Sequence, residues 1–402
     1  MLHISGFIGS NNAPDEEDPW RDLPLAALPI AIDIEADTVD ILNVLPYDLA
    51  ESIIDMCSGD KETMKSCSLV CREWTHRSRF HLLEMSCIRV NRVNAGAFVS
   101  LLESPHFALR KIPYMELSFR GESSPVSEGV VPLLVKQRVV IRSLVMVADT
   151  LAEGSCRKSF PHLASIGKAS LTELSLRNHL PDKLFDILQF IYSFPRLEKL
   201  SFTGVYRGLV SPSKLPARLR EFSFINGRSR GTDQVLHWLI SPKAPSLPCL
   251  STLVVDGITD ADISTVQKLL DATRNHLRYL DLRHVHIHDV VLHFEKLRYL
   301  QRLVIHPHIH SLQSSPIQFI KKMLLTISAY NLKEIELHLP HIQIPHLDES
   351  QCRCLDDAFT LPQLSDVERL TIKTNYTASV LLSETFATCQ SKGIFNLVVG
   401  GS

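Results

Sequence analysis

Apolar and polar residues alternate in a short pattern that recurs along most of the chain. The pattern is L-x-x-L-x-L, in which other apolar residues replace leucine and the last two apolar positions lie two residues apart. Side chains two apart share one face of a strand, so each copy predicts a strand with one buried face. The copies recur about every 28 residues, a period typical of repeat architectures. They are Ile141-Leu144-Met146, Leu171-Leu174-Leu176, Leu197-Leu200-Phe202, Leu219-Phe222-Phe224, Leu250-Leu253-Val255, Leu277-Leu280-Leu282, Leu300-Leu303-Ile305, Leu332-Ile335-Leu337, Val367-Leu370-Ile372 and Ile394-Leu397-Val399, with a degenerate copy at Tyr114-Leu117-Phe119.

Helical periodicity fills several gaps between these copies. Apolar residues recur at spacings of three and four in Leu184–Ile191, Val235–Leu239, Ile263–Leu270, Ile317–Leu324 and Val380–Phe386. Strands that alternate with helices and all run in one direction predict an α/β fold. We expect residues 91–402 to form a curved solenoid, with a parallel sheet on its concave side and helices on its convex side. No polar capping repeat follows the last copy, which predicts an exposed sheet edge.

The stretch from 44 to 90 has a different pattern, that of three short helices. Pro46 suits a helix start, Ser58-Gly59 ends the first helix, and Asp60 suits the N-cap of the second. So small a unit has more apolar side chains than its core can bury, and surplus apolar surface indicates a partner. Residues 1–43, which include the acidic run Asp15–Asp18, are predicted to form a disordered leader.

Two linked motifs in this helical head resemble a known family. Leu45-Pro46-Tyr47-Asp48-Leu49, followed by Ser68-Leu69-Val70-Cys71-Arg72-Glu73-Trp74, resembles the F-box, especially that of the large fungal F-box families. The irregular repeats likewise resemble the leucine-rich repeats of F-box proteins. The resemblance implies that the head docks on the Skp-type adaptor of a cullin–RING ubiquitin ligase. The adaptor-contacting positions would be Leu45, Pro46, Leu49, Ile53, Leu69, Val70, Cys71 and Trp74. The alternative is a three-helix cap that only covers one end of the array.

Polar side chains between and after the apolar strand positions should face the concave surface. Solenoids characteristically bind partners there, so we expect this face to recognise a protein target. The alternative is a solvated sheet face without a partner. The strongest candidates are Arg177, Lys199, Glu221, Asp256, Tyr279, Asp281, Arg283, Arg302, Glu336 and Arg369, accompanied by Glu173, His306, Glu334, His338 and Lys373.

Composition narrows the function further. The 42 basic and 44 acidic residues give a net charge near −2. The sequence also lacks the basic stripe with interleaved aromatic residues that is typical of nucleic-acid-binding proteins. We find no signal peptide and no membrane-spanning stretch, which favours the cytoplasm, the nucleus or both. The nine cysteines are odd in number and irregularly spaced, which favours free thiols in a reducing compartment.

Histidines gather in the second half of the chain but do not form a recognisable metal motif. They are His284, His286, His288, His293, His306, His308, His310, His338, His341 and His346, with Cys352 and Cys354 nearby in sequence. We expect them in solvated loops where strands leave the sheet, with a zinc site as the alternative. The sequence has no G-x-S-x-G, H-E-x-x-H, phosphate-binding glycine loop or dinucleotide-binding motif. It therefore predicts neither an enzyme, nor a metal site, nor a cofactor.

These observations favour a substrate-recognition subunit of an SCF-type ubiquitin ligase, in which the head binds the adaptor and the array binds a protein target. Two alternatives stay open. One is a leucine-rich-repeat scaffold that acts outside any ligase, and the other is a zinc-dependent hydrolase built on the histidine-rich half.

Overall fold

The chain forms an α/β fold built on one parallel sheet. A computed structural model describes residues 46–85, 87–104, 111–121, 124–148, 153–177, 184–203, 215–225, 232–240, 249–286, 291–308, 315–339 and 348–400. In this part of the chain, 12 strands pair side by side in sequence order and all neighbours are parallel. The predicted parallel sheet is confirmed, whereas the leader and Leu45 lie outside the described residues.

Each predicted copy of the pattern forms one strand, and the copies stack in register. Leu253 is paired with Leu280, and Leu280 with Leu303, so equivalent apolar side chains form continuous buried rows. The strands are β1 (Ile88–Val90), β2 (Lys111–Phe119), β3 (Val140–Ala148), β4 (Glu173–Arg177), β5 (Lys199–Thr203), β6 (Glu221–Ile225), β7 (Thr252–Asp256), β8 (Tyr279–His286), β9 (Arg302–His308), β10 (Glu334–Leu339), β11 (Arg369–Thr374) and β12 (Phe395–Val399).

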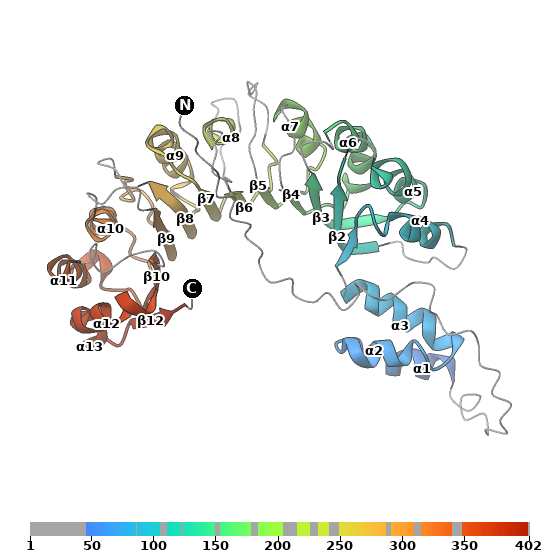
Figure 1. Ribbon diagram of the computed structural model, residues 1–402, viewed down its shortest axis with the longest axis horizontal. Coiled ribbons are helices and arrows are strands. Elements are labelled where there is room, and N and C mark those ends of the chain that lie inside the picture. The colour runs from blue at the N-terminus through green and yellow to red at the C-terminus, as the bar shows by residue number, and fades with distance from the viewer. Residues whose placement is uncertain are drawn as a thin grey trace, which may run out of the picture.

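Helices lie side by side along one side of the row of strands, and the other side, here called the open face, carries none of the described helices (Figure 1). The apolar strand rows and the inner faces of the helices form one hydrophobic core. The helices are α4 (Ala95–Glu103), η2, a π-helix (Val126–Val130), α5 (Val131–Lys136), α6 (Glu153–Gly167), α7 (Leu184–Tyr192), α8 (Thr232–Leu239), α9 (Asp260–Thr273), α10 (Pro316–Leu325), α11 (Glu349–Ala358), η4 (Pro362–Leu364), α12 (Tyr376–Thr385) and α13 (Ala387–Ser391).

Three helices, α1 (Tyr47–Met56), α2 (Lys61–Cys67) and α3 (Arg72–Met85), precede the sheet and lie at the end of the row that holds β1 and β2 (Figure 1). Asp60 caps α2 by accepting a hydrogen bond from the backbone N–H of Glu62, as predicted. This helical head has a small core of its own, formed by Ile54, Met64 and Cys67 and separate from the core of the sheet.

The carboxylate of Asp55 on α1 links α1 to α3. Asp55 accepts hydrogen bonds from Arg77 Nε and Nη2, both at 2.6 Å, and lies 2.7 Å from His81 Nε2. Hydrogen bonds from Arg77 and then His81 hold the pKa of Asp55 far below its usual range. The ion pair therefore joins the first helix to the third, which contacts β2.

Other expectations concern the cysteines, the sheet edge and the membrane. All nine cysteines are free thiols, as predicted. Within the described residues β12 pairs only with β11, and Val398 and Val399 are exposed on it. Among the helices that the structure describes, none combines the length and the apolar character needed to cross a membrane.

Candidate functional site

The helical head exposes a set of large apolar side chains, here called the head surface. Tyr47, Leu49, Ile53 and Met56 lie on α1, and Leu69 and Val70 lie in the turn between α2 and α3. The exposed fraction is 49% for Leu49, 75% for Leu69 and 87% for Met56. Leu49, Ile53 and Met56 share one face of α1, and the opposite face buries Ala50 and Ile54, so the helix is apolar on both sides and only one side is covered by its own fold.

The structure divides the predicted adaptor positions into two groups. Leu49, Ile53, Leu69 and Val70 belong to the head surface, and Pro46 is exposed beside them as the N-cap of α1. Two others, Trp74 and Cys71, are less exposed.

Trp74 is partly buried and packs against the small core of the head, while Cys71 is partly buried at the start of α3. Tyr47 and Met56 were not among the predicted contacts. Met56 could have been found from the sequence, because Leu49, Ile53 and Met56 are spaced by four and three residues and so share one helix face.

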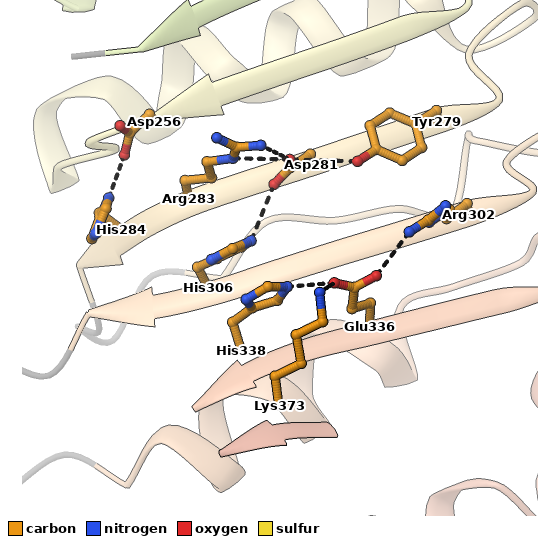
Figure 2. Close-up of polar contacts among 10 residues, drawn as sticks. All are labelled: Asp256, Tyr279, Asp281, Arg283, His284, Arg302, His306, Glu336, His338 and Lys373. Atoms are coloured by element: carbon orange, nitrogen blue, oxygen red, sulfur yellow. Dashed lines mark hydrogen bonds and ion pairs between the residues drawn. The ribbon is translucent and has the colours of Figure 1, made fainter. Parts of the chain in front are cut away.

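A network of charged and histidine side chains covers strands β7 to β11 on the open face (Figure 2). We call it the polar cluster, and it consists of Asp256, Tyr279, Asp281, Arg283, His284, Arg302, His306, Glu336, His338 and Lys373. Most of these residues alternate with buried apolar residues, as in β10, where Glu334, Glu336 and His338 alternate with Ile335, Leu337 and Leu339. The exception is the bulge of β8, where His284 directly follows Arg283. The sequence pattern therefore predicted the face of the cluster residues other than His284, which was expected in a loop.

Glu336 is the most connected acceptor in the cluster. It accepts hydrogen bonds from Arg302 Nη2 at 2.8 Å, from Lys373 Nζ at 2.6 Å and from His338 Nε2 at 2.5 Å. Burial alone would raise its pKa, but hydrogen bonds from Lys373, His338 and Arg302 outweigh burial and lower the pKa to about 2. Because an ionised carboxylate only accepts, the shared proton belongs to Nε2 of His338.

Asp281 is the most deeply buried carboxylate of the cluster. Its Oδ2 accepts hydrogen bonds from Arg283 Nε at 2.9 Å and Nη2 at 2.8 Å, and from the Tyr279 hydroxyl at 3.5 Å. Its Oδ1 lies 3.5 Å from His306 Nε2 but makes no hydrogen bond with the described residues. The buried Asp281 side chain therefore contacts Tyr279, Arg283 and His306.

His306 and His338 stack face to face across β9 and β10. Their ring centroids are 3.6 Å apart and their planes differ by 19°. Burial, followed by the charges of His338 and Arg283, lowers the pKa of His306 to about 3. Burial also lowers the pKa of His338, although its hydrogen bond to Glu336 opposes the effect. Both rings are therefore neutral at neutral pH.

Of the two positions predicted for these histidines, the strand face is confirmed and the solvated loop is wrong. His306 and His338 lie inside β9 and β10, because these strands extend beyond the last apolar residue of each copy, to His308 and Leu339. His284 also lies within a strand, at a bulge of β8 where its φ is +46°, and its Nδ1 lies 2.6 Å from Asp256 Oδ1. Only His293, of those whose surroundings are described, lies exposed between two strands.

The remaining candidate residues lie elsewhere on the same face. Arg177, Lys199 and Glu221 belong to β4, β5 and β6, which precede the cluster along the sheet. Lys199 Nζ lies 3.8 Å from Glu173 and 3.2 Å from Glu221, so it bridges two neighbouring strands.

Nearer the cluster, Arg369 Nη1 lies 3.3 Å from Glu334 Oε1. The Arg302 guanidinium lies 5.5 Å from the centre of the Tyr279 ring, in a cation–π arrangement. The side chains of adjacent strands therefore form pairs across the open face.

The histidines do not converge on a metal site in the described part of the chain. No group of three or more His, Cys, Asp and Glu side chains there is arranged to hold a metal ion. His288, His310, His341 and His346 lie outside the described residues, and nothing is described of the side chains of His286 and His308.

No protein-family model matches the chain, and a search of curated proteins finds no match. The functional assignment therefore depends on the head motifs, the repeat pattern and the two surfaces described above.

Proposed function

We propose that the chain is the substrate-recognition subunit of an SCF-type cullin–RING ubiquitin ligase. The head surface binds a Skp-type adaptor, and the array, a curved leucine-rich-repeat solenoid, presents its concave open face to a protein target. The observation that carries the proposal is the exposure of Leu49, Ile53, Leu69 and Val70 at the positions where the F-box-like motifs predict adaptor contacts.

The free energy of apolar burial supports this assignment. Fully burying a Leu, Val or Met side chain contributes about 1.5 to 3 kcal/mol, and the head surface leaves several such side chains in water. An uncovered apolar group of this kind on a small domain is typical of a protein-binding site. A cap that served only the array would turn its apolar side chains toward the sheet, whereas these side chains are solvent-exposed.

In this function the chain performs no bond chemistry of its own. It holds a target near a charged ubiquitin carrier and so raises the effective concentration of target lysines there. Adaptor binding and target binding would use separate surfaces, because the head surface lies on α1 and the α2–α3 turn while the polar cluster lies on β7 to β11.

Co-purification with a Skp-type adaptor tests the proposal. We expect the wild-type chain to retain the adaptor and the double variant Leu49→Ser/Leu69→Ser to lose it. A matched control is Val93→Ser, which removes an apolar side chain outside the head that is even more exposed than Leu49 and Leu69. The proposal would be contradicted if the wild type and the double variant retained equal amounts of the adaptor, or if neither retained any.

A leucine-rich-repeat scaffold that acts outside a ligase is the second candidate. It is favoured by the polar cluster, whose contacts all come from the array and need nothing from the head. Retention of a target protein without any adaptor binding would favour this function.

A further inference from the structure

The charges of the polar cluster are arranged in layers. The cationic side chains of Arg283, Arg302 and Lys373 keep exposed fractions of 38%, 44% and 43%, whereas their carboxylate partners Asp281 and Glu336 keep 2% and 12%. Arg369 extends the exposed layer at 63%, while Glu334, which pairs with both Arg369 and Arg302, is 33% exposed. A ligand that approaches β8 to β11 therefore meets cations first, although the total charge of the cluster is balanced.

The same face is different on β4 to β6. There Lys199 is 48% exposed, but its partners Glu173 and Glu221 are 39% and 41% exposed. A ligand meets both signs of charge at that point. The cationic layer is thus a property of one part of the open face and does not follow from the alternating pattern alone.

The buried carboxylates also fix the positions of the cations. Arg283 donates from Nε and Nη2 to Asp281, and Lys373 and Arg302 donate to Glu336. Arginine and lysine carry further N–H donors beyond those used in these bonds. Side chains held in place in this way lose less conformational entropy on binding, so an anionic ligand would bind to these cations at a lower entropic cost.

The spread of the layer indicates what kind of anion fits. The cations lie on β8, β9 and β11, and strands are about 4.8 Å apart, so the layer is about 14 Å wide. A single phosphate needs donors that converge on one point. An extended peptide of about five residues spans the same width and can place several carboxylates along it.

We propose that the open face of β8 to β11 binds an extended, carboxylate-rich segment of the target protein. This inference rests on the proposed function and names the class of target that it would recognise. The cations of Arg283, Arg302, Lys373 and Arg369 pair with successive Asp or Glu side chains of that segment.

Fluorescence anisotropy with the full chain tests this inference. The probes are a labelled peptide with alternating glutamates, its glutamine counterpart, and a neutral peptide with one phosphoserine. We expect only the glutamate peptide to bind well, and its affinity to fall as salt is added because the contacts are partly exposed. Arg369→Gln should weaken binding about threefold to tenfold, and Arg369→Gln/Lys373→Gln should weaken it further.

The matched control is Lys199→Gln, which removes a cation of similar exposure from β5 and should leave the affinity unchanged. Circular dichroism melting checks that each variant is folded, and Arg369→Gln keeps the buried network around Glu336 intact. Equal affinity for the glutamate and glutamine peptides, tighter binding of the phosphoserine peptide, or equal losses from Arg369→Gln and Lys199→Gln would overturn the inference. Adaptor binding is measured separately, so failure here leaves the proposed function standing, and the reverse also holds.

Discussion

Replacing His306 should change how the stability of the chain depends on pH. The ring is stacked on His338 from β10 and faces Asp281, Arg283 and His284 of β8. Its pKa is about 3 in the folded chain, whereas an ordinary histidine titrates near pH 6.5. The folded chain therefore holds this ring neutral at pH values where the unfolded chain protonates it.

The sign of the effect follows from proton binding. Between about pH 6.5 and pH 3 the unfolded state binds a proton at this position that the folded state does not bind, so stability falls as the pH is lowered. At about pH 5 the difference of about 1.5 pH units from the unfolded value corresponds to a loss of about 2 kcal/mol. Glu336 contributes in a lower window, because its folded pKa of about 2 makes its stabilisation fall only below its ordinary value of 4.5.

Urea unfolding followed by circular dichroism measures this difference. His306→Gln removes the titrating ring, so the variant should lose about 2 kcal/mol less than the wild type when the pH is lowered from about 7 to about 5. The control is His293→Gln, which changes an exposed histidine outside the strands and should retain the wild-type pH dependence. Identical pH dependence of the wild type and His306→Gln would refute the assignment of a neutral, buried ring.

Three further substitutions test the packing of the array by urea unfolding. Phe222→Ala removes a fully buried ring of β6 and should cost about 3 to 5 kcal/mol; a loss below about 1 kcal/mol would contradict its place in the core. Asp356→Asn weakens a buried carboxylate that accepts the backbone N–H groups of Thr388 and Cys389, and should cost about 1 to 3 kcal/mol, with faster amide exchange in α13. Gly393→Ala should cost about 1 to 2 kcal/mol, because the glycine has a φ of +70° in open space; an unchanged midpoint would refute strain there.

The strand positions could be predicted because each depends on a local pattern. Leu280 and Leu282 lie two apart, so both had to be buried on one face, and the intervening Asp281 had to face the other way. The parallel arrangement followed from the helices between the copies. Stacking of equivalent positions then brought Tyr279 beside Arg302 across two strands.

Other elements were missed because their local signals are weak. Helix α6 contains Pro161 and begins and ends near glycines, so its sequence lacks the continuous apolar spacing of α7. Strand β1 is only three residues long, and Ile88–Val90 had been grouped with the head. Its pairing with β2 is a long-range contact that no local pattern contains.

The layering of charge was likewise hidden in the sequence. Alternation placed Asp281 and Lys199 on the same face, but it could not show that one is buried and the other exposed. That difference depends on neighbours from other strands, such as Val304, which is paired with Asp281 and is itself buried on the same face. The stacking of His306 on His338 has the same origin, since it needs the register between β9 and β10.

Amide hydrogen exchange of the chain with and without a purified Skp-type adaptor tests the central claim most directly. The proposed function predicts new protection in Tyr47–Met56 and around Leu69 and Val70, with exchange in β7 to β11 unchanged. Exchange that does not change on adding the adaptor, or new protection confined to the sheet, would contradict the assignment of the head surface as the adaptor-binding site.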